Sequence, residues 1–135
     1  MKKDDCIFCK LANGDIPTNK IYEDDNFTVI LDLGPATKGH ALILPKDHAD
    51  CLFDLPDETA AKILPLAKKL GKKMVDSLNA DGMNVIQNNG EVAGQSVLHY
   101  HLHLIPRYKN DGQHLLWKPG KMSDEEAKEI LDALT

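Results

Sequence analysis

The sequence predicts an α+β fold, with an antiparallel sheet of about five strands, one long helix and short helices near both ends. Three observations lead to this prediction. Strand-like segments are mostly joined by short loops, which favours antiparallel pairing. One central segment repeats its apolar residues with the helical period. The length of 135 residues and the hydrophobic share of 42% suit a single domain, residues 1–135, around one core.

The strands are expected where short β-branched and apolar runs stand between turn residues. An acidic turn at Asp24–Asn26 separates the first two of these runs. Pro106 has no amide proton, so it should close the last strand or place it at an edge of the sheet. The expected strands are KIYED (20–24), NFTVILDL (26–33), HALILP (40–45), MNVIQ (83–87) and SVLHYHLHLIP (96–106).

The two short helices lie near the ends of the chain. Cys6–Asn13 has the length of a short helix, and Gly14 follows it as a plausible stop. The stretch from Ser123 to Glu126 has the capping-box pattern and predicts a helix that runs to about Leu134.

The long helix is expected to begin with Asp54 as its N-cap and Pro56 in its first turn, and to end at Asn79–Gly82. Pro65 lies inside it and should kink or divide it, because proline removes one helical hydrogen bond. The positions expected to face the core are Ala60, Ile63, Leu64, Ala67, Leu70, Met74 and Leu78.

Charge and composition exclude several classes of protein. A net charge of −5 argues against a broad nucleic-acid surface, which needs a basic face, although a local phosphate site is allowed. No apolar run approaches the about 18–20 residues of a membrane span, and the start MKKDDCIFCK has no apolar segment of a signal peptide. Three cysteines, two of them in a CxxC pair, fit the reducing cytoplasm better than a secreted disulfide framework.

The chemistry concentrates in residues 97–106, VLHYHLHLIP, where His99, His101 and His103 stand at alternate positions. Side chains alternate along a strand, so the three imidazoles share one face at a spacing of about 6.5–7 Å. Nothing in a solvent-facing strand requires imidazole three times. Two interpretations remain open: the histidines bind zinc, or one supplies a neutral nitrogen for nucleophilic or acid–base chemistry. The opposite, core-facing set is Leu98, Tyr100, Leu102 and Leu104.

A polar, glycine-containing loop, NNGEVAGQS (88–96), leads into the histidine segment. Gly90 and Gly94 allow a ligand to approach the backbone closely, and Asn88, Gln95 and Ser96 add hydrogen-bond donors. Taken alone, this is a polar hairpin loop. Directly before a row of imidazoles, it indicates a phosphate or oxyanion held against a nucleophile.

These segments together resemble the histidine triad (HIT) family. HYHLHLI (99–105) fits the family signature His-φ-His-φ-His-φ-φ, where φ is apolar, and GQS (94–96) is similar to the family's phosphate loop. CIFCKLANGDIP and IYEDDNFTVILDLGPATKGHALILPKDH also look like family segments, in the family's order. The resemblance covers about residues 6–108, with 109–135 as a C-terminal tail, and implies a HIT-like fold.

HIT proteins are nucleotide hydrolases and transferases. The resemblance therefore implies attack on the α-phosphate of a purine nucleoside phosphoramidate or a related nucleotide derivative, with no catalytic metal. His101 would be the nucleophile and form a nucleotidyl-histidine intermediate. Gln95, Ser96 and His103 would stabilise charge on the phosphoryl oxygens, and Ser96 could also assist the leaving group. His40 would help to orient the triad.

The resemblance also places the nucleoside. Asp32 matches the carboxylate that binds the ribose hydroxyls, although its position before Gly34 equally suits a turn residue. Asn88 matches a phosphate-side contact, and Gly94 belongs to the phosphate loop. The positions that match the apolar base pocket, and that would otherwise be plain core, are Ile7, Phe8, Leu11, Ile30 and Leu33.

Cys6 and Cys9 have the spacing of a zinc half-site. A redox pair usually follows a strand, and almost no chain precedes Cys6; two inert thiols are a further alternative. By spacing alone, His48 and Cys51 could complete the site. The resemblance instead favours a structural zinc bound by Cys6, Cys9, His48 and His99.

The family's proteins are commonly homodimers with a sheet continuous across the interface. Trp117 and Pro119 would then lie near a partner's site; alternatively, Trp117 covers the core. His114 has no assigned role and is expected at the surface. Two other functions remain open: a nucleotide-binding or scaffolding protein with little catalysis, and a metal-dependent hydrolase that uses the three histidines as ligands.

Overall fold

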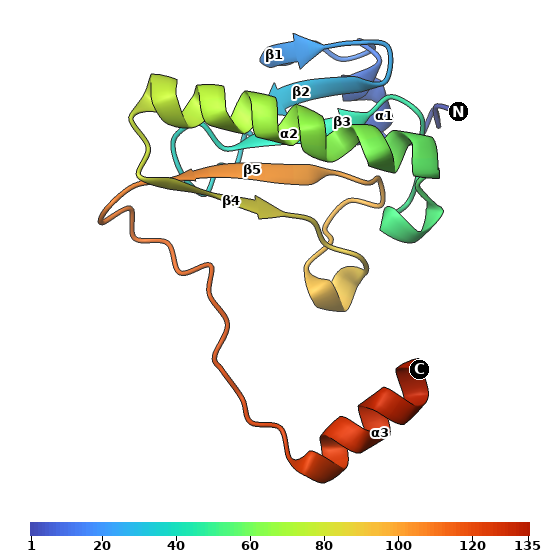
Figure 1. Ribbon diagram of the computed structural model, residues 1–135. Coiled ribbons are helices and arrows are strands. Elements are labelled where there is room, and N and C mark those ends of the chain that lie inside the picture. Colours follow the sequence, from blue (N-terminus) through green and yellow to red (C-terminus); the bar gives the residue numbers. More distant parts are fainter.

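The computed structural model describes all 135 residues and contains a five-stranded antiparallel sheet in the order β1-β2-β3-β5-β4 (Figure 1). The long helix α2 crosses one face of the sheet, and the short helix α1 lies against the other. The predicted α+β class, the sheet of about five strands, the long helix and the two short helices are confirmed. The strands are β1 (Lys20–Glu23), β2 (Phe27–Leu31), β3 (Ala41–Pro45), β4 (Gly82–Ile86) and β5 (Leu102–Arg107).

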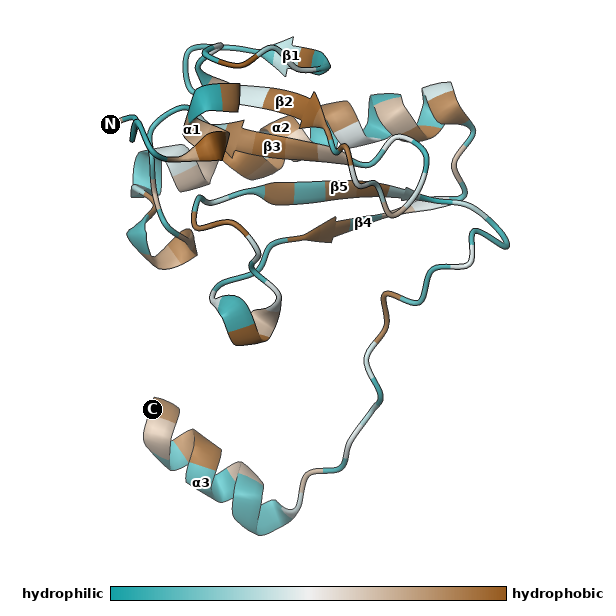
Figure 2. Ribbon diagram, turned by 180° about the vertical axis from the view of Figure 1, so that it is seen from behind, coloured by the Kyte–Doolittle hydropathy of each residue, from teal (hydrophilic) through white to brown (hydrophobic).

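Both faces of the central strands are covered, so these strands are almost continuously apolar (Figure 2). In β3, Ala41 and Ile43 pack into the main core beneath α2. Leu42 and Leu44 instead join a smaller cluster beneath α1. The sheet therefore serves as the middle layer, and the α1 side carries the histidines described below.

The turn between β1 and β2 is held by Asp24, as the sequence predicts. Its Oδ1 accepts hydrogen bonds from the backbone N–H groups of Asn26, at 2.7 Å, and Phe27, at 2.8 Å. An aspartate that accepts from amides two and three residues ahead fixes a tight turn locally.

Helix α2 (Asp57–Leu78) is one continuous helix that contains Pro65. The prediction that Asp54 caps it is wrong, because Asp54 belongs to a separate 3₁₀ turn, η1 (Leu52–Asp54), and Pro56 precedes the helix without a side-chain cap. The helix is also not divided at Pro65. Proline removes only one backbone hydrogen bond, and the packing of other α2 residues into the core keeps the helix continuous. Leu64, predicted to face the core, is 64% exposed. Asn79, in the left-handed conformation, ends the helix as predicted.

Strand β5 begins later than predicted, at Leu102, so His101 precedes it and His99 lies in a bend in which its N–H donates to the Val97 carbonyl. Leu98, assigned to the core face, is 63% exposed. The prediction for Pro106 is wrong: it lies within β5, between β3 and β4 in the sheet. It is tolerated because β3 pairs with β5 only as far as Leu104. Beyond that point, the Thr37 hydroxyl donates to the Pro106 carbonyl instead.

Helix α1 (Ile7–Ala12) starts at Cys6, whose Sγ accepts a hydrogen bond from the Cys9 N–H at 3.3 Å. The cap thus fixes one cysteine relative to the other, one turn further on. Cys9 is fully buried, and Cys6 is partly exposed.

The C-terminal helix α3 (Asp124–Leu134) begins as predicted, with the Ser123 side chain accepting from the Glu126 N–H. It stands away from the sheet at the end of an extended arm (Figure 1). Trp117 is 80% exposed, so the alternative that it covers the core is wrong. His114 is exposed, as expected. None of the helices is both long enough and apolar enough to span a membrane.

Candidate functional site

A pocket of about 650 Å³ lies on the α1 side of the sheet and contains two of the three triad histidines at its wall. Nine of the predicted site residues line it: Ile7, Phe8, Leu11, Ile30, Asp32, Leu33, Ser96, His101 and His103. Residues 16–19 and the side chains of Leu31 and Leu42 complete the wall. Sequence reasoning missed residues 16–19, IPTN, because only the fold brings this connection between α1 and β1 across the pocket.

His101 is held in one tautomer by the backbone before it. Its Nδ1 lies 2.7 Å from the His99 carbonyl oxygen. A carbonyl can only accept, so Nδ1 carries a proton, and in the neutral ring Nε2 keeps its lone pair. The ring is only 4% exposed, and the edge of the Phe8 ring packs against it at 5.0 Å between centroids. The structure therefore provides an unprotonated nitrogen on a tightly positioned imidazole at the pocket.

His103 is fixed by a chain of hydrogen bonds that starts in the backbone. The Ala36 N–H donates to Nδ1 of His40 at 2.9 Å. In a neutral His40 the proton is then on Nε2, which lies 2.9 Å from Nδ1 of His103 and donates to it. By the same reasoning, His103 carries its own proton on Nε2. This leaves a hydrogen-bond donor on His103 beside the lone pair on His101, whose ring centroid is 5.0 Å away.

Burial keeps both His40 and His103 neutral. Burial, aided by the nearby His101 and His40 rings, lowers the pKa of His103 to about 4. Burial also lowers the pKa of His40, although the carboxylate of Asp32 opposes the shift. At neutral pH the pair therefore presents oriented neutral imidazoles.

Asp32 forms the turn that its sequence position predicts and also lines the pocket. Oδ1 accepts from the Gly34 N–H at 2.9 Å and forms the turn after β2. Oδ2 lies 3.5 Å from Nε2 of His40, and the residue lines the pocket. A carboxylate is thus held at the edge of an otherwise apolar wall.

The loop before the histidines is braced by Gln95. Its Nε2 donates to the carbonyls of Asp50, at 2.6 Å, and Val97, at 3.0 Å, while Oε1 accepts from the Gly90 N–H at 2.9 Å. These bonds use both amide protons on the protein itself. Gln95, Asn88 and Gly94 do not line the pocket, and their contacts with a substrate stay predictions. Ser96 reaches the pocket from this loop.

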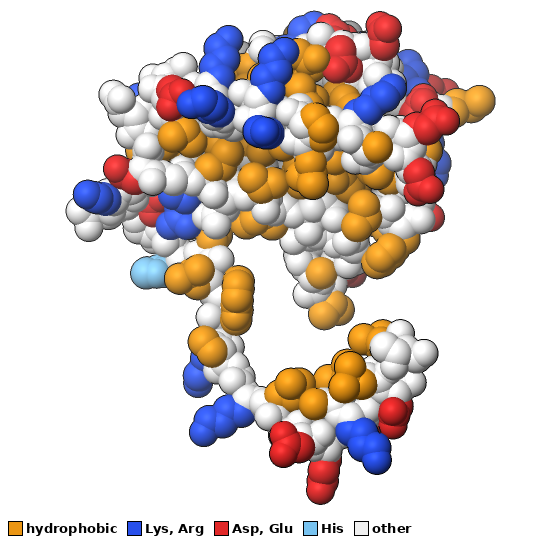
Figure 3. All heavy atoms as spheres, in the orientation of Figure 1, with side chains coloured by type: hydrophobic (Ala, Val, Ile, Leu, Met, Phe, Trp, Pro, Cys, Tyr) orange, Lys and Arg blue, Asp and Glu red, His pale blue; other side chains and the backbone are white.

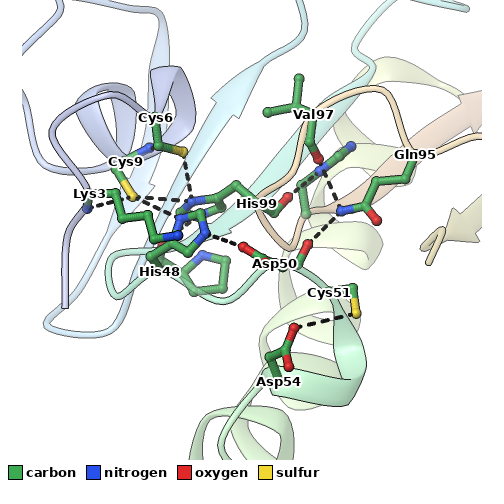
Figure 4. A network of polar contacts seen from close by, with 12 residues as sticks. Lys3, Cys6, Cys9, His48, Asp50, Cys51, Asp54, Gln95, Val97 and His99 are labelled. Carbon is green, nitrogen blue, oxygen red and sulfur yellow. Dashed lines mark hydrogen bonds and ion pairs between the residues drawn. The ribbon is translucent and has the colours of Figure 1, made fainter. Parts of the chain in front are cut away.

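A second cluster lies behind the pocket, where four potential metal ligands converge (Figure 4). The ligand atoms of Cys6, Cys9, His48 and His99 all lie within 4.8 Å of one another. Nδ1 of His99 is 3.4 Å from the Cys6 sulfur and 3.3 Å from the Cys9 sulfur, and Nδ1 of His48 is 3.4 Å from the Cys9 sulfur. Nitrogen and sulfur ligands of a tetrahedral zinc are about 3.5 Å apart, so these three distances already match ligands around one ion.

The outer hydrogen bonds of the two histidines support metal binding. Nε2 of His99 donates to the Pro45 carbonyl at 2.9 Å, and Nε2 of His48 donates to Asp50 at 2.6 Å. Each donation leaves the lone pair on Nδ1, which points at the sulfurs, and a partner on the far nitrogen is typical of ligating histidines. Burial lowers the pKa of His99 to about 4, so the ring is neutral, as a ligand must be.

Cys51 does not belong to this cluster. Its sulfur lies 3.8 Å from Asp54 in the η1 turn, apart from the other thiols (Figure 4). The geometry therefore favours the set with His99 over the alternative with Cys51.

Asp32, His40 and His103 also place three ligand atoms within 4.8 Å of one another, but their hydrogen bonds argue against a metal there. Nδ1 of His40 accepts a hydrogen bond from the Ala36 N–H, so in the neutral ring Nε2 carries the proton and donates rather than coordinates a metal. The three triad histidines do not converge on one point either, since His99 faces the thiols and His101 turns Nδ1 to a carbonyl.

The sheet, with a pocket on one face and histidines beneath it, defines an α+β protein with an imidazole-centred ligand site. The family model for the HIT domain matches residues 13–110. The chain belongs to the HIT family.

A larger cavity, of about 860 Å³, lies between α2 and β4, but none of the histidines lines it.

The sequence similarity to related proteins extends over most of the chain. Protein hit of Bacillus subtilis is 45% identical over 116 residues, covering 85% of this chain and 80% of that protein. Adenosine 5'-monophosphoramidase hnt1 of Schizosaccharomyces pombe is 43% identical over 126 residues, covering 93% and 92%. The adenylylsulfatase HINT3 of Arabidopsis thaliana is 34% identical over 138 residues, covering 98% and 68%.

Solved structures show the same architecture. A protein from Streptococcus mutans superposes with a TM-score of 0.93 at 34% identity, covering 98% of this chain and 85% of that one. A Zn-bound histidine triad family protein from Mycobacterium smegmatis has a TM-score of 0.77 at 36% identity, covering 97% and 98%.

Proposed function

We propose that the protein hydrolyses nucleoside 5'-phosphoramidates or related nucleotide derivatives, with His101 as the nucleophile toward the α-phosphorus. The observation that carries the proposal is the bond from Nδ1 of His101 to the His99 carbonyl, which leaves Nε2 unprotonated. Relatives named adenosine 5'-monophosphoramidase and adenylylsulfatase support the substrate class, because both names describe nucleotides with a leaving group on the α-phosphate.

The pocket offers a suitable surface to each part of such a substrate. A purine base would lie against Phe8, Leu11 and Ile30 on the apolar wall. The ribose hydroxyls would donate to the Asp32 carboxylate, and the phosphate would meet Ser96 and the Nε2–H of His103. The base therefore binds by apolar contact, while the polar groups fix the phosphorus at the imidazole.

In the first step, Nε2 of His101 forms a bond to phosphorus while the bond from phosphorus to the leaving amine breaks. The amine leaves with a proton supplied by the hydroxyl of Ser96, which lines the pocket from the loop. The phosphorylated ring still has its proton on Nδ1 and is cationic, so the His99 carbonyl stabilises it. In the second step, water attacks phosphorus while its proton returns to the Ser96 oxygen, and the bond from phosphorus to Nε2 breaks, which releases the nucleoside monophosphate and restores the neutral imidazole.

A zinc ion on Cys6, Cys9, His48 and His99 would be structural in this proposal. When bound, it neutralises the two thiolates and ties the N-terminal segment to the histidine segment. The Mycobacterium smegmatis neighbour described as Zn-bound supports this assignment. Retention of two thiolate ligands also favours the cytoplasm, where thiols stay reduced.

The proposed unit is a homodimer of single HIT domains, with residues 109–135 as a tail. Strand β4 is at the edge of the sheet, and Val85 on it is 49% exposed. An uncovered edge strand is a ready site for pairing with another chain, so pairing of two β4 strands would make the sheet continuous across the dimer.

The test is turnover of adenosine 5'-phosphoramidate without added metal, followed by release of AMP. The His101→Ala variant should lose at least about a thousandfold in kcat while it still binds AMP, because it removes the nucleophile. His114→Ala, at an exposed histidine, is the matched control and should keep full activity.

Three outcomes separate the alternatives. Mass spectrometry of the quenched wild-type enzyme should detect the nucleotidyl adduct, which His101→Ala should lack. Nucleotide binding without turnover of any analogue would favour a binding protein. Loss of turnover on chelation, with the fold intact by circular dichroism and restored activity on adding zinc, would favour a metal-dependent hydrolase.

A further inference from the structure

Asp50 lies between the four converging metal ligands and the loop at residues 88–96 (Figure 4). Its carboxylate Oδ1 accepts a hydrogen bond from Nε2 of His48 at 2.6 Å, and its backbone carbonyl accepts from Nε2 of Gln95, also at 2.6 Å. One residue therefore bonds to a proposed metal ligand through its side chain and to the brace of the loop through its backbone.

A second route joins the same two regions. The Val97 carbonyl accepts from the N–H of His99 at 2.9 Å and from Nε2 of Gln95 at 3.0 Å. Gln95 is thus tied to both histidine ligands, each time through one intervening residue. It is 8% exposed, and its Oε1 accepts from the Gly90 N–H at 2.9 Å. The position of this one amide side chain therefore sets the path of the loop from Gly90 onward.

The backbone of residues 49–52 is fastened at two more points, to the loop and to the histidine segment that follows it. The Ala49 carbonyl accepts from the Tyr100 N–H at 2.7 Å, and Oδ1 of Asn89 accepts from the Leu52 N–H at 2.8 Å. These bonds make the segment and the loop one connected unit. A shift of the segment would therefore also shift the loop.

Metal binding would act on this unit through His48. Its Nδ1 lies 3.4 Å from the Cys9 sulfur, and its Nε2 donates to Asp50. With Nδ1 coordinated, the ring is held at both nitrogens, and the Nε2–H becomes a stronger donor to the carboxylate. The segment that begins at this histidine then loses freedom, and the loop bonded to the segment loses freedom with it.

We propose that Asp50 is a positioning residue that couples the metal site to the loop that presents Ser96 to the phosphate. Occupation of the metal site orders the loop. Nucleotide bound against the loop in turn strengthens metal binding by the same factor, because the coupling between two binding sites is reciprocal. The inference rests on the proposed function for the role of the loop and on the proposed zinc ligands, and it adds the link between them.

The test measures the order of the loop in the full-length protein with and without zinc. The Gly90 N–H donates to Oε1 of Gln95, and the Gln95 N–H donates to the Gly90 carbonyl at 3.0 Å. Hydrogen–deuterium exchange of these two amides, followed by NMR, therefore reports on opening of the loop. The amide of Lys109, bonded to Asp81 in a separate turn, is the internal reference. Zinc is removed with a chelator, the fold is checked by circular dichroism, and zinc is then restored.

Three variants isolate the carboxylate. Asp50→Ala removes the acceptor of His48 but keeps all four proposed ligands and the backbone carbonyl, and it should fold because the side chain is 40% exposed. Asp50 forms no ion pair with the lysines that gather over α2 (Figure 3), so no such pair is lost. Asp50→Asn keeps an oxygen that can accept from the ring. Asp25→Ala, at an exposed aspartate between β1 and β2, is the matched control.

In the wild type, removal of zinc should speed exchange of the two loop amides at least about tenfold and leave the reference amide unchanged. Asp50→Asn and Asp25→Ala should respond in the same way. In Asp50→Ala the loop amides should exchange at one rate with and without zinc. Competition with a chromophoric chelator should show zinc bound about tenfold more weakly to this variant. AMP should tighten zinc binding to the wild type and not to Asp50→Ala.

Loop amides that exchange equally with and without zinc in the wild type would overturn the coupling. A wild-type response in Asp50→Ala would overturn the role of Asp50, since the link would then run by another path. A protein that takes up no zinc would refute both this inference and the zinc assignment. Turnover of the phosphoramidate, measured on the same samples, is a separate result: a loop that responds to zinc in a protein without turnover would support the coupling and refute the catalytic proposal.

Discussion

Protonation of His103 should make the stability of the protein depend on pH in a predictable direction. Burial lowers the pKa of this residue from 6.5 to about 4 in the folded protein. The unfolded chain therefore binds a proton below about pH 6.5 that the folded protein does not accept until about pH 4. Above pH 6.5 both states are neutral, so the full stability is present there and is lost as the pH falls.

The size of the effect follows from the difference between the two pKa values. A difference of about 2.5 pKa units, at about 1.4 kcal/mol per unit, corresponds to about 3 kcal/mol of unfolding free energy lost between pH 7 and pH 4. The lowered pKa of His40 acts in the same direction. The loss should level off once the folded protein also takes up the proton.

The assay is urea unfolding at several pH values for the wild type, His103→Asn and His114→Asn. Asparagine cannot titrate, so the His103→Asn curve should fall by about 3 kcal/mol less than the wild-type curve over this range. His114 is exposed, and its variant should parallel the wild type. If the His103→Asn curve also parallels the wild type, His103 is not the buried neutral group described here, and the assignment of its Nε2–H as a donor fails.

Three further substitutions test other parts of the structure. Cys9→Ser should release the bound metal, measured by elemental mass spectrometry, whereas Cys51→Ser should retain it; metal loss in the second variant would contradict the assigned ligands. Gly39→Ala should lower the unfolding free energy by about 1–3 kcal/mol, because φ is +91° and a Cβ would meet the end of α2. Gly120→Ala, in open space, is the control, and equal urea midpoints would refute the argument. His40→Ala should lower kcat about tenfold or more with little change in KM, because the third triad histidine loses the donor that fixes its tautomer; an unchanged kcat would exclude that positioning role.

Local patterns in the sequence predicted the elements that depend on neighbouring residues. The Asp24 turn, the Ser123 cap and the stop at Asn79 each use contacts within four residues, so a short stretch contains the relevant information. The start of α2 was placed too early because an aspartate before a proline resembles a cap. In the fold, Asp54 is already part of a preceding 3₁₀ turn, in which its N–H donates to the Cys51 carbonyl.

The site was predictable to a different extent. The spacing of the histidines and cysteines left metal binding and nucleophilic chemistry both open, and the family resemblance supplied the site residues, nine of which the fold gathers around one pocket. The bracing role of Gln95 was not visible, because its partners include a carbonyl 45 residues away. Residues 16–19 gave no signal at all, since their place in the wall depends only on the path of the chain.

Backbone groups, which no residue type in the sequence reveals, set the tautomer of each triad histidine and the direction of its lone pair. The Pro45 carbonyl turns the lone pair of His99 toward the thiols, and the His99 carbonyl turns the lone pair of His101 toward the pocket. The Ala36 amide acts through His40 to make the third triad histidine a donor. Three peptide groups thus orient three similar imidazoles for the three proposed roles of ligand, nucleophile and donor. Substituting the side chains at 36 and 45 should therefore leave these roles intact as long as the backbone keeps its path.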